Sequence, residues 1–134
     1  MRLRKLKIKD AKFMLEWMHD PSVVKYLQTD FLAKTIEDCI NFIRSSQDTI
    51  QNIHLAIVDE KDEYMGTVSL KNITKDAEFA ITIRNIAMGK GYSKFGMKEI
   101  IRIGLQELNL TSVYWCVSPD NVRAVRFYDK NGYQ

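Results

Sequence analysis

The sequence is poor in cysteine, proline and glycine and has no long apolar segment. Its 134 residues include 2 Cys, 2 Pro and 6 Gly. Because Cys39 and Cys116 stand far apart and neither belongs to a CxxC pair, a disulfide scaffold and a cysteine-based zinc site are excluded. The few Gly and Pro exclude collagen-like and low-complexity chains. No run of roughly 18 apolar residues occurs, so we expect no membrane-spanning segment.

An excess of charge of one sign is also missing. Lys plus Arg number 20 and Asp plus Glu number 17, and a net charge of +3 does not by itself indicate a nucleic-acid partner. With 46% hydrophobic and 28% charged residues, the chain is expected to form a single globular domain over 1–134. Since the basic residues after Met1 precede no apolar run, we expect no secretory signal, and the free thiols favour a cytoplasmic protein.

Hydrophobic periodicity predicts alternating strands and helices. A period of two residues indicates strands, and a period of about 3.6 residues indicates helices. The predicted strands are 3–8, 54–58, 65–70, 78–83 and 112–117, and the predicted helices are 11–18, one that starts after Thr35, 92–108 and 121–130. This β-α-α-β-β-β-α-β-α order is typical of an α/β (α+β) fold, a mixed sheet with helices packed on it.

Local signals refine these elements. Asp10 is expected to cap the helix 11–18, Asp20-Pro21 to end it, and Thr35 with Asp38 to form a capping box for the next helix. On the strand 78–83, alternate residues are expected to face opposite sides of the sheet, with Glu78 on the polar side. The helix 92–108 is expected to bury one stripe, namely Met97, Ile100, Ile101, Gly104, Leu105 and Leu108.

The loop between the strand 78–83 and the helix that follows it is a candidate anion site. Its sequence is Met88-Gly89-Lys90-Gly91-Tyr92-Ser93. Glycines allow the backbone N–H groups to approach an anion, and the positive end of the helix dipole points to the same place. The loop is neither a Walker A motif nor a GxGxxG fingerprint, because Gly91 follows Lys90 and Lys94 occupies the third glycine position. A glycine turn without a ligand is the alternative.

A second motif lies near the C-terminus. Asn121, Ala124 and Tyr128 share one face of the predicted helix 121–130, which is suited to a ligand. An ordinary amphipathic helix with a tyrosine in the core is the alternative.

Together the two motifs resemble the GNAT N-acetyltransferase superfamily, and the resemblance covers essentially the whole chain. Strands 65–70 and 77–83 look like the family's third and fourth strands, and WMHDPSVVKY (17–26) is similar to the first-helix region of the ribosomal-protein-alanine, spermidine and amino-sugar branch. The resemblance implies a GNAT-like mixed, mostly antiparallel central sheet flanked by helices. The family's loop usually opens with Gln or Arg, where this chain has Met88, and closes with Gly or Ala, where it has Ser93. The family adds one or two strands after the last motif, so we expect C-terminal strands to be truncated or missing here.

The implied co-substrate is acetyl-CoA, with its diphosphate on the loop amides and its pantetheine arm between the fourth and fifth strands. The residues implied to bind it are Ile81, Thr82, Ile83, Met88, Gly89, Lys90, Gly91, Tyr92, Ser93 and Asn121. The implied reaction is direct attack of a neutral amine on the thioester. Tyr128 matches the family's general acid, which protonates the leaving thiolate.

The base is left open. Glu78 is one candidate, and two alternatives for it are a carboxylate that only attracts a cationic amine and a solvated glutamate at the start of the strand. Cys116 stands at another frequent position for the base, but a cysteine in a strand is usually a small buried hydrophobic residue. Deprotonation relayed by water is a third alternative. His19 and His54 are interpreted as structural residues, and no metal is expected.

Several functions are compatible with these residues. The leading hypothesis is an N-acetyltransferase for a small-molecule amine such as an amino sugar, a polyamine or an aminoglycoside. Acetylation of a protein N-terminus or lysine is a close alternative, and a non-catalytic acyl-CoA-binding module, which has no use for Tyr128, is a rival of another class. We expect no nucleic-acid or membrane partner, and the sequence leaves open whether the chain forms a homodimer.

Overall fold

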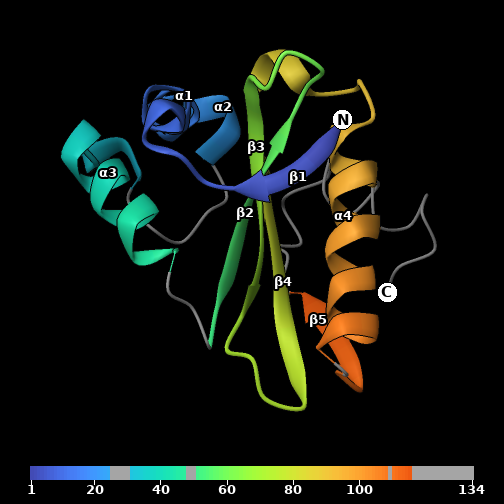
Figure 1. Ribbon diagram of the computed structural model, residues 1–134. Coiled ribbons are helices and arrows are strands. Elements are labelled where there is room, and N and C mark those ends of the chain that lie inside the picture. The colour runs from blue at the N-terminus through green and yellow to red at the C-terminus, as the bar shows by residue number, and fades with distance from the viewer. Residues whose placement is uncertain (25–30, 48–50, 109, 116–134) are drawn as a thin grey trace.

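The computed structural model describes residues 1–24, 31–47, 51–108 and 110–115 (Figure 1). Within these ranges five strands form one sheet in the order β1-β2-β3-β4-β5. The strands are β1 (Arg2–Lys5), β2 (Ile53–Val58), β3 (Tyr64–Lys71), β4 (Asp76–Ile83) and β5 (Ser112–Trp115). Strands β1 to β4 pair antiparallel, whereas β4 and β5 pair parallel. The expected mixed, mostly antiparallel sheet is confirmed.

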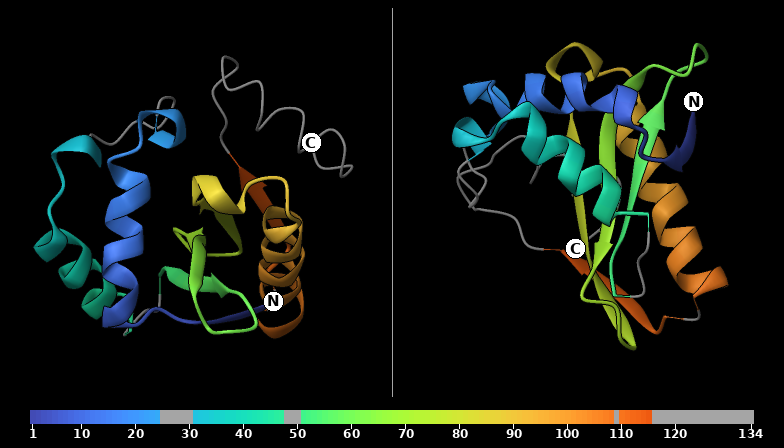
Figure 2. Two further views of the ribbon diagram at one scale, coloured as in Figure 1. Left: turned by 90° about the horizontal axis from the view of Figure 1, so that it is seen from above. Right: turned by 60° about the vertical axis from the view of Figure 1, so that its left-hand side comes forward.

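Helices cover both faces of this sheet. They are α1 (Ala11–Met18), α2 (Pro21–Val24), α3 (Ile36–Ser45) and α4 (Tyr92–Arg102). Figure 2 shows α1 and α3 on one face and α4 on the other. Because a parallel pair of strands needs a crossover connection, α4 carries the chain from the end of β4 back to the start of β5. No helix in the described ranges is long and apolar enough to cross a membrane.

Two predicted helix signals are confirmed. The Thr35 hydroxyl accepts a hydrogen bond from the Asp38 N–H, and the Asp38 carboxylate accepts one from the Thr35 N–H, which is the capping box of α3. Helix α1 ends at Met18, before Asp20-Pro21, and Pro21 then opens the short helix α2. Proline suits this first helical position because its missing N–H would have no helical partner there.

The first strand is shorter than predicted, and Asp10 does not cap α1. β1 ends at Lys5, and the chain then makes a 3₁₀ turn, Ile8–Asp10, in which Ile8 is 48% exposed. The buried Asp10 carboxylate accepts hydrogen bonds from the Arg4 guanidinium and from the Lys7 N–H, each at 2.8 Å. These bonds bend the segment away from the sheet and occupy the oxygens that would otherwise cap the helix.

The sheet separates two hydrophobic cores. One lies beneath α4 and includes Ile57, Val68, Leu70, Phe79, Met97 and Ile100. The other lies between the sheet and helices α1 and α3, and includes Met14, Trp17, Cys39, Ile43, Ala56 and Tyr64. Alternating residues of β2 and β3 therefore serve different cores.

The prediction of one regular helix over 92–108 is wrong at its C-terminal end. α4 is regular to Arg102 and is followed by a π-helical turn, Ile103–Glu107. The wider turn changes the direction of the side chains from there on, so Leu105 within the turn and Leu108 after it are 44% and 38% exposed. Gly104 is buried, and a Cβ there would lie 3.1 Å from the Leu110 side chain.

Candidate active site

The loop between β4 and α4 has the backbone shape that its glycines predicted. The chain passes through a 3₁₀ turn, Asn85–Ala87, and an extended Met88 before Gly89 and Gly91 adopt the left-handed region, with φ of 77° and 90°. Residues with a Cβ rarely adopt this region, so both positions favour glycine. The order of strand, glycine loop and helix is thus confirmed.

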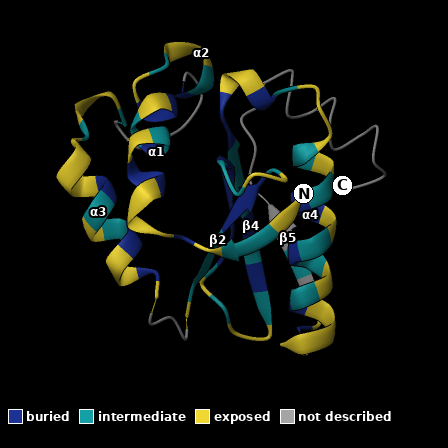
Figure 3. Ribbon diagram, turned by 45° about the horizontal axis from the view of Figure 1, so that its top comes forward, coloured by how far each residue is buried: buried dark blue, intermediate teal, exposed yellow. Residues whose placement is uncertain are grey.

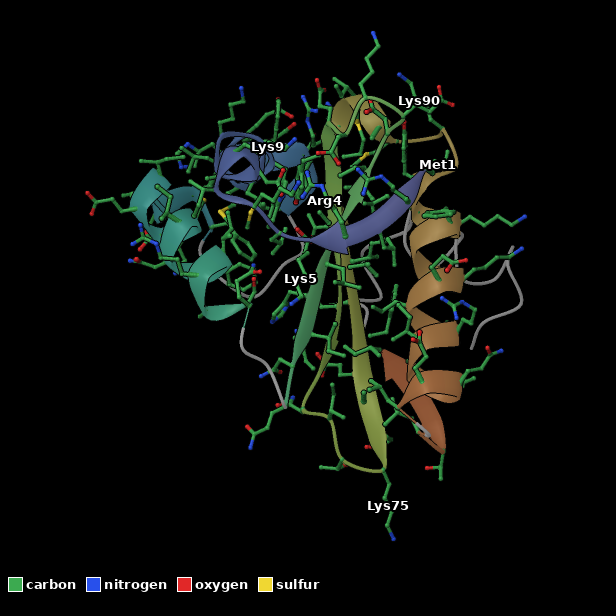
Figure 4. The ribbon with its side chains drawn as sticks, viewed as in Figure 1. Met1, Arg4, Lys5, Lys9, Lys75 and Lys90 are labelled. Atoms are coloured by element: carbon green, nitrogen blue, oxygen red, sulfur yellow. The ribbon has the colours of Figure 1, made fainter. Side chains whose placement is uncertain are left out.

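The same loop offers an accessible set of backbone donors. The first amides of a helix have no intrahelical partner, and in α4 the Phe95 N–H bonds to the Gly91 carbonyl. Residues 89–91 are exposed, and a Cβ at Gly89 would meet nothing within 4 Å. Figure 4 shows Lys90 at this end of α4. Exposed N–H groups and the positive helix end fit a diphosphate group, although the binding roles of 88–93 stay predictions.

A buried arginine fixes the end of β4 from which this loop starts. Arg84 is 5% exposed and binds Glu16 of α1 through two hydrogen bonds of 2.8 and 3.0 Å. It also donates to Glu63 at 2.8 Å and to the Tyr64 carbonyl at 3.0 Å, and it lies over the Phe13 ring. The bonds to Glu16 and then to Glu63 raise the pKa of the guanidinium. Arg84 therefore ties the start of the loop to α1 and to the β2–β3 turn.

The second half of β4 lies beyond its described pairing with β5. β4 pairs with β3 along residues 78–83, whereas its described pairing with β5 extends from Asp76 to Phe79. Of the predicted pantetheine-binding residues, Ile83 is buried in the core beneath α4 and the Ile81 side chain packs against the same core, whereas Thr82 alternates to the opposite face of the sheet and lines a cavity there.

This cavity, of about 400 Å³, lies between the sheet and the layer of α1 and α3. Its floor is lined by residues of three adjacent strands: His54 of β2, Thr67, Ser69 and Lys71 of β3, and Ala80, Ile81 and Thr82 of β4. Its walls are Met14, Trp17, Met18, Phe31, Lys34, Asp38, Asn41 and Phe42. The polar face predicted for β4 thus opens into a space large enough for a small molecule.

His54 takes part in this cavity, which the sequence interpretation missed. Its Nδ1 lies 2.6 Å from the Ser69 Oγ, and its ring packs against Phe42 with 4.7 Å between the ring centres. Burial, and secondarily the positive charge of Lys71, lower the pKa of His54, so the imidazole is neutral at neutral pH. The strand alternation could have indicated this position, since His54 and Ala56 share one face of β2. The sequence interpretation considered the histidines only as metal ligands or structural residues.

A buried hydrogen-bonded network holds one end of the cavity. The Trp17 indole N–H donates to the Tyr64 hydroxyl at 2.9 Å, and that hydroxyl lies 2.5 Å from the Thr67 Oγ1. Tyr64 is fully buried, which raises the pKa of its phenol, so it remains protonated. The Trp17 ring also meets Phe31 edge-on at 5.0 Å. These contacts fix the orientation of Trp17 and Thr67 at the cavity surface.

The candidate base Glu78 lies at the rim. It stands opposite Lys71 in the β3–β4 register, its side chain is 24% exposed, and its carboxylate forms an ion pair with Lys71 at 3.1 Å. Lys71 lines the cavity, and Glu78 itself is not among the lining residues. The prediction that Glu78 acts as the base stays a prediction.

The remaining candidates divide into two groups. Tyr128, Asn121 and Cys116 lie outside the described residues. His19 is exposed, and its Nε2 lies 2.8 Å from the Lys34 carbonyl oxygen. Among the described residues no group of three or more His, Cys, Asp or Glu side chains is arranged to hold a metal ion.

Comparison with known proteins identifies the class to which this fold and loop belong. The family model of the GNAT acetyltransferase domain matches residues 1–134, so the chain belongs to the GNAT acetyltransferase family. It is accordingly an N-acetyltransferase that uses acetyl-CoA, which confirms the resemblance drawn from the two motifs.

Particular relatives are more distant. An uncharacterized N-acetyltransferase p20 of Bacillus licheniformis is 28% identical over 140 residues, covering 100% of this chain and 79% of the relative. Spermidine N(1)-acetyltransferase of Escherichia coli K12 is 25% identical, covering 99% and 72%. The crystal structure of spermidine N-acetyltransferase from Vibrio cholerae in complex with CoA and spermine has a TM-score of 0.86 and 22% identity, covering 98% and 79%. This last similarity shows the fold.

Proposed function

We propose that this enzyme acetylates the primary amine of a small molecule, and that its acceptor is an amino sugar rather than a polyamine. The observation that carries the proposal is the cavity beside β4, with its aromatic walls and a floor whose hydrogen-bonding side chains are uncharged apart from Lys71. The similarity to spermidine acetyltransferases supports a small amine as the acceptor class. The side chains that line the cavity favour an amino sugar among such amines.

The charges around the cavity do not favour a polycation. Lys34 and Lys71 line it together with one carboxylate, Asp38, which caps α3, and the nearby Glu78 already pairs with Lys71. A polyamine carries several positive charges at neutral pH, because each alkyl amine titrates near about 10. It would meet two lysines here and a single carboxylate, that of Asp38, among the described lining residues.

The uncharged lining suits a polyhydroxylated ring. Trp17, Phe31 and Phe42 offer aromatic surface for the C–H faces of a sugar. Donors and acceptors for hydroxyl groups come from Asn41, His54, Thr67, Ser69 and Thr82. Apolar walls with a few converging polar groups are the usual composition of a small-molecule site.

Different residues of the chain are proposed to bind acetyl-CoA, to bind the amine and to donate the proton. The amides of 89–93 and the edge formed by Ile81, Thr82 and Ile83 are proposed to hold acetyl-CoA, with Asn121 completing that site. When bound, acetyl-CoA supplies the activated acetyl group. The cavity orients the amine, and Tyr128 is proposed to donate a proton to the leaving thiolate.

The test is release of thiol from acetyl-CoA with a panel of amines: glucosamine, spermidine, an aminoglycoside and a peptide with a free N-terminus. We expect kcat/KM for glucosamine to exceed that for spermidine at least ~10-fold, the discrimination expected when charges mismatch by about 1.4 kcal/mol or more. A preference for spermidine would overturn the amino-sugar assignment. Binding of CoA without thiol release from any amine would instead support the non-catalytic module.

A further inference from the structure

We propose that Ser69 and His54 form a proton relay that removes the proton from the acceptor's ammonium group, with Ser69 beside the amine and His54 as the final proton acceptor. The inference rests on the proposed function only in that the cavity binds the acceptor amine. It does not depend on which amine that is.

The strand register places the relay in line with β4. His54 pairs with Ser69 across β2 and β3, and Ser69 pairs with Ala80 across β3 and β4. Neighbouring strands are about 4.8 Å apart, so Ser69 lies one strand from β4 and His54 lies two. Because the methyl group of Ala80 leaves room over β4, an amine there can reach the Ser69 hydroxyl, whereas the imidazole is too distant for direct contact.

The contact between the two side chains supports transfer of a proton. The Ser69 Oγ and the His54 Nδ1 are 2.6 Å apart, Ser69 is 5% exposed, and Phe42 packs against the imidazole. Both side chains line the cavity. Ser69 is therefore buried and His54 half-buried, and both face the space in which the acceptor is proposed to bind.

The proton balance is simple. The ammonium N–H bond breaks and its proton passes to the Ser69 Oγ, while the Ser69 hydroxyl proton passes to the His54 Nδ1. The products are a neutral amine, an unchanged serine hydroxyl and an imidazolium with protons on both nitrogens. The starting imidazole carries its proton on Nε2, the tautomer in which Nδ1 accepts the serine hydroxyl.

Charged groups around His54 suit this role. Lys71 of β3, Glu78 of β4, Asp38 of α3 and Lys34 before α3 all lie at the cavity or its rim, and Glu78 and Asp38 are engaged with Lys71 and with Thr35. Burial and Lys71 hold the imidazole neutral and ready to accept a proton. The two lysines also disfavour an ammonium ion in the cavity, which lowers the pKa of the amine.

The activity test is a pH profile of kcat/KM for Ser69→Ala and His54→Gln, run with whichever amine the enzyme uses best. At pH 7 we expect each to lose roughly 100-fold, as for a general base, and the double variant to be no worse than either. At a pH above the pKa of the amine used, the deficit should shrink, because the free amine needs no base. Losses below ~3-fold, or a deficit that is the same at every pH, would overturn the relay.

Matched controls separate the relay from general damage. Ser45→Ala removes an exposed hydroxyl that bonds to the Phe42 carbonyl, and His19→Gln changes a histidine outside the cavity. Both should keep the wild-type profile, and circular dichroism should show all variants folded. If spermidine proves the best amine while the pH profiles behave as expected, the amino-sugar assignment fails and the relay stands.

A readout without substrates uses NMR titration of the His54 ring in the free protein. We expect its pKa to lie below the ordinary value of about 6.5, and Lys71→Gln to raise it by removing the neighbouring charge. Lys75→Gln is the matched control, because Lys75 lies at the far turn between β3 and β4 (Figure 4). An unchanged His54 titration in Lys71→Gln would contradict the electrostatic coupling on which the relay relies.

Discussion

The two faces of the sheet come from the same strands and have different contents. Toward α4, Val68, Leu70 and Phe79 belong to a core with almost no exposure. Toward α1 and α3, the alternate residues are Thr67, Ser69 and Ala80, and a cavity of about 400 Å³ remains. Figure 3 shows the two helical layers standing on either side of the buried strands. The comparison teaches that the face toward α4 is filled by its core, whereas the face toward α1 and α3 combines a second core with a space that can bind a ligand.

The largest expected effect is on the α4 face. Ile100 is fully buried, so Ile100→Ala should lower the free energy of unfolding by about 2–5 kcal/mol through lost burial and a residual cavity. Chemical denaturation measures this loss. Leu105→Ala is the control, because Leu105 is exposed and should change stability by less than about 0.5 kcal/mol. Equal losses for the two variants would mean that the π-helical turn is wrongly placed.

The next effect concerns chemistry. Tyr128→Phe should leave acetyl-CoA affinity nearly intact and lower kcat at least ~10-fold, because it removes only the proposed proton donor. Calorimetry and the thiol-release assay measure the two quantities. Unchanged turnover would remove Tyr128 from the mechanism.

A smaller effect is expected at the glycine loop. Gly91 has a φ of 90°, so Gly91→Ala forces a left-handed residue at a cost of about 1–2 kcal/mol. If the strain relaxes by displacing the loop amides, acetyl-CoA affinity should fall about 10-fold, measured by calorimetry. Lys90→Ala keeps the backbone conformation, so it should lower acetyl-CoA affinity less than Gly91→Ala does. A larger loss for Lys90→Ala would show that the side chain, not the amides, holds the co-substrate.

The smallest effect is on the pH dependence of stability. The pKa of His54 is lower in the folded state than its ordinary value, so the unfolded chain takes up the proton first as the pH falls. Stability from this group is therefore complete above about pH 6.5 and declines below it. Urea midpoints at about pH 7.5 and pH 5.5 should differ more for the wild type than for His54→Gln. The same difference in both proteins would contradict a neutral, buried imidazole.

Features set by short-range signals could be predicted from the sequence. The capping box of Thr35 and Asp38, the alternation along β4 and the glycines of the 89–91 loop each depend on residues a few positions apart. Such signals also carried the family resemblance, since both motifs are local patterns.

Features set by distant contacts could not be predicted. The Asp10 carboxylate accepts a hydrogen bond from Arg4 instead of capping α1, and the π-helical turn places the buried Gly104 against Leu110. His54 became a cavity residue only through its pairing with Ser69 on the neighbouring strand. Each outcome depends on which segments meet in space, which periodicity does not encode. The roles of Asn121 and Tyr128 remain predictions from the motif.

The central claim is that the acceptor and the co-substrate occupy different parts of the molecule, and amide chemical shifts test it most directly. Titration with glucosamine should shift signals of the cavity residues His54, Ser69 and Thr82, whereas titration with CoA should shift those of Gly89 to Ser93 at the start of α4. Glucosamine shifts confined to the α4 face, or CoA shifts that leave the glycine loop unchanged, would contradict the account.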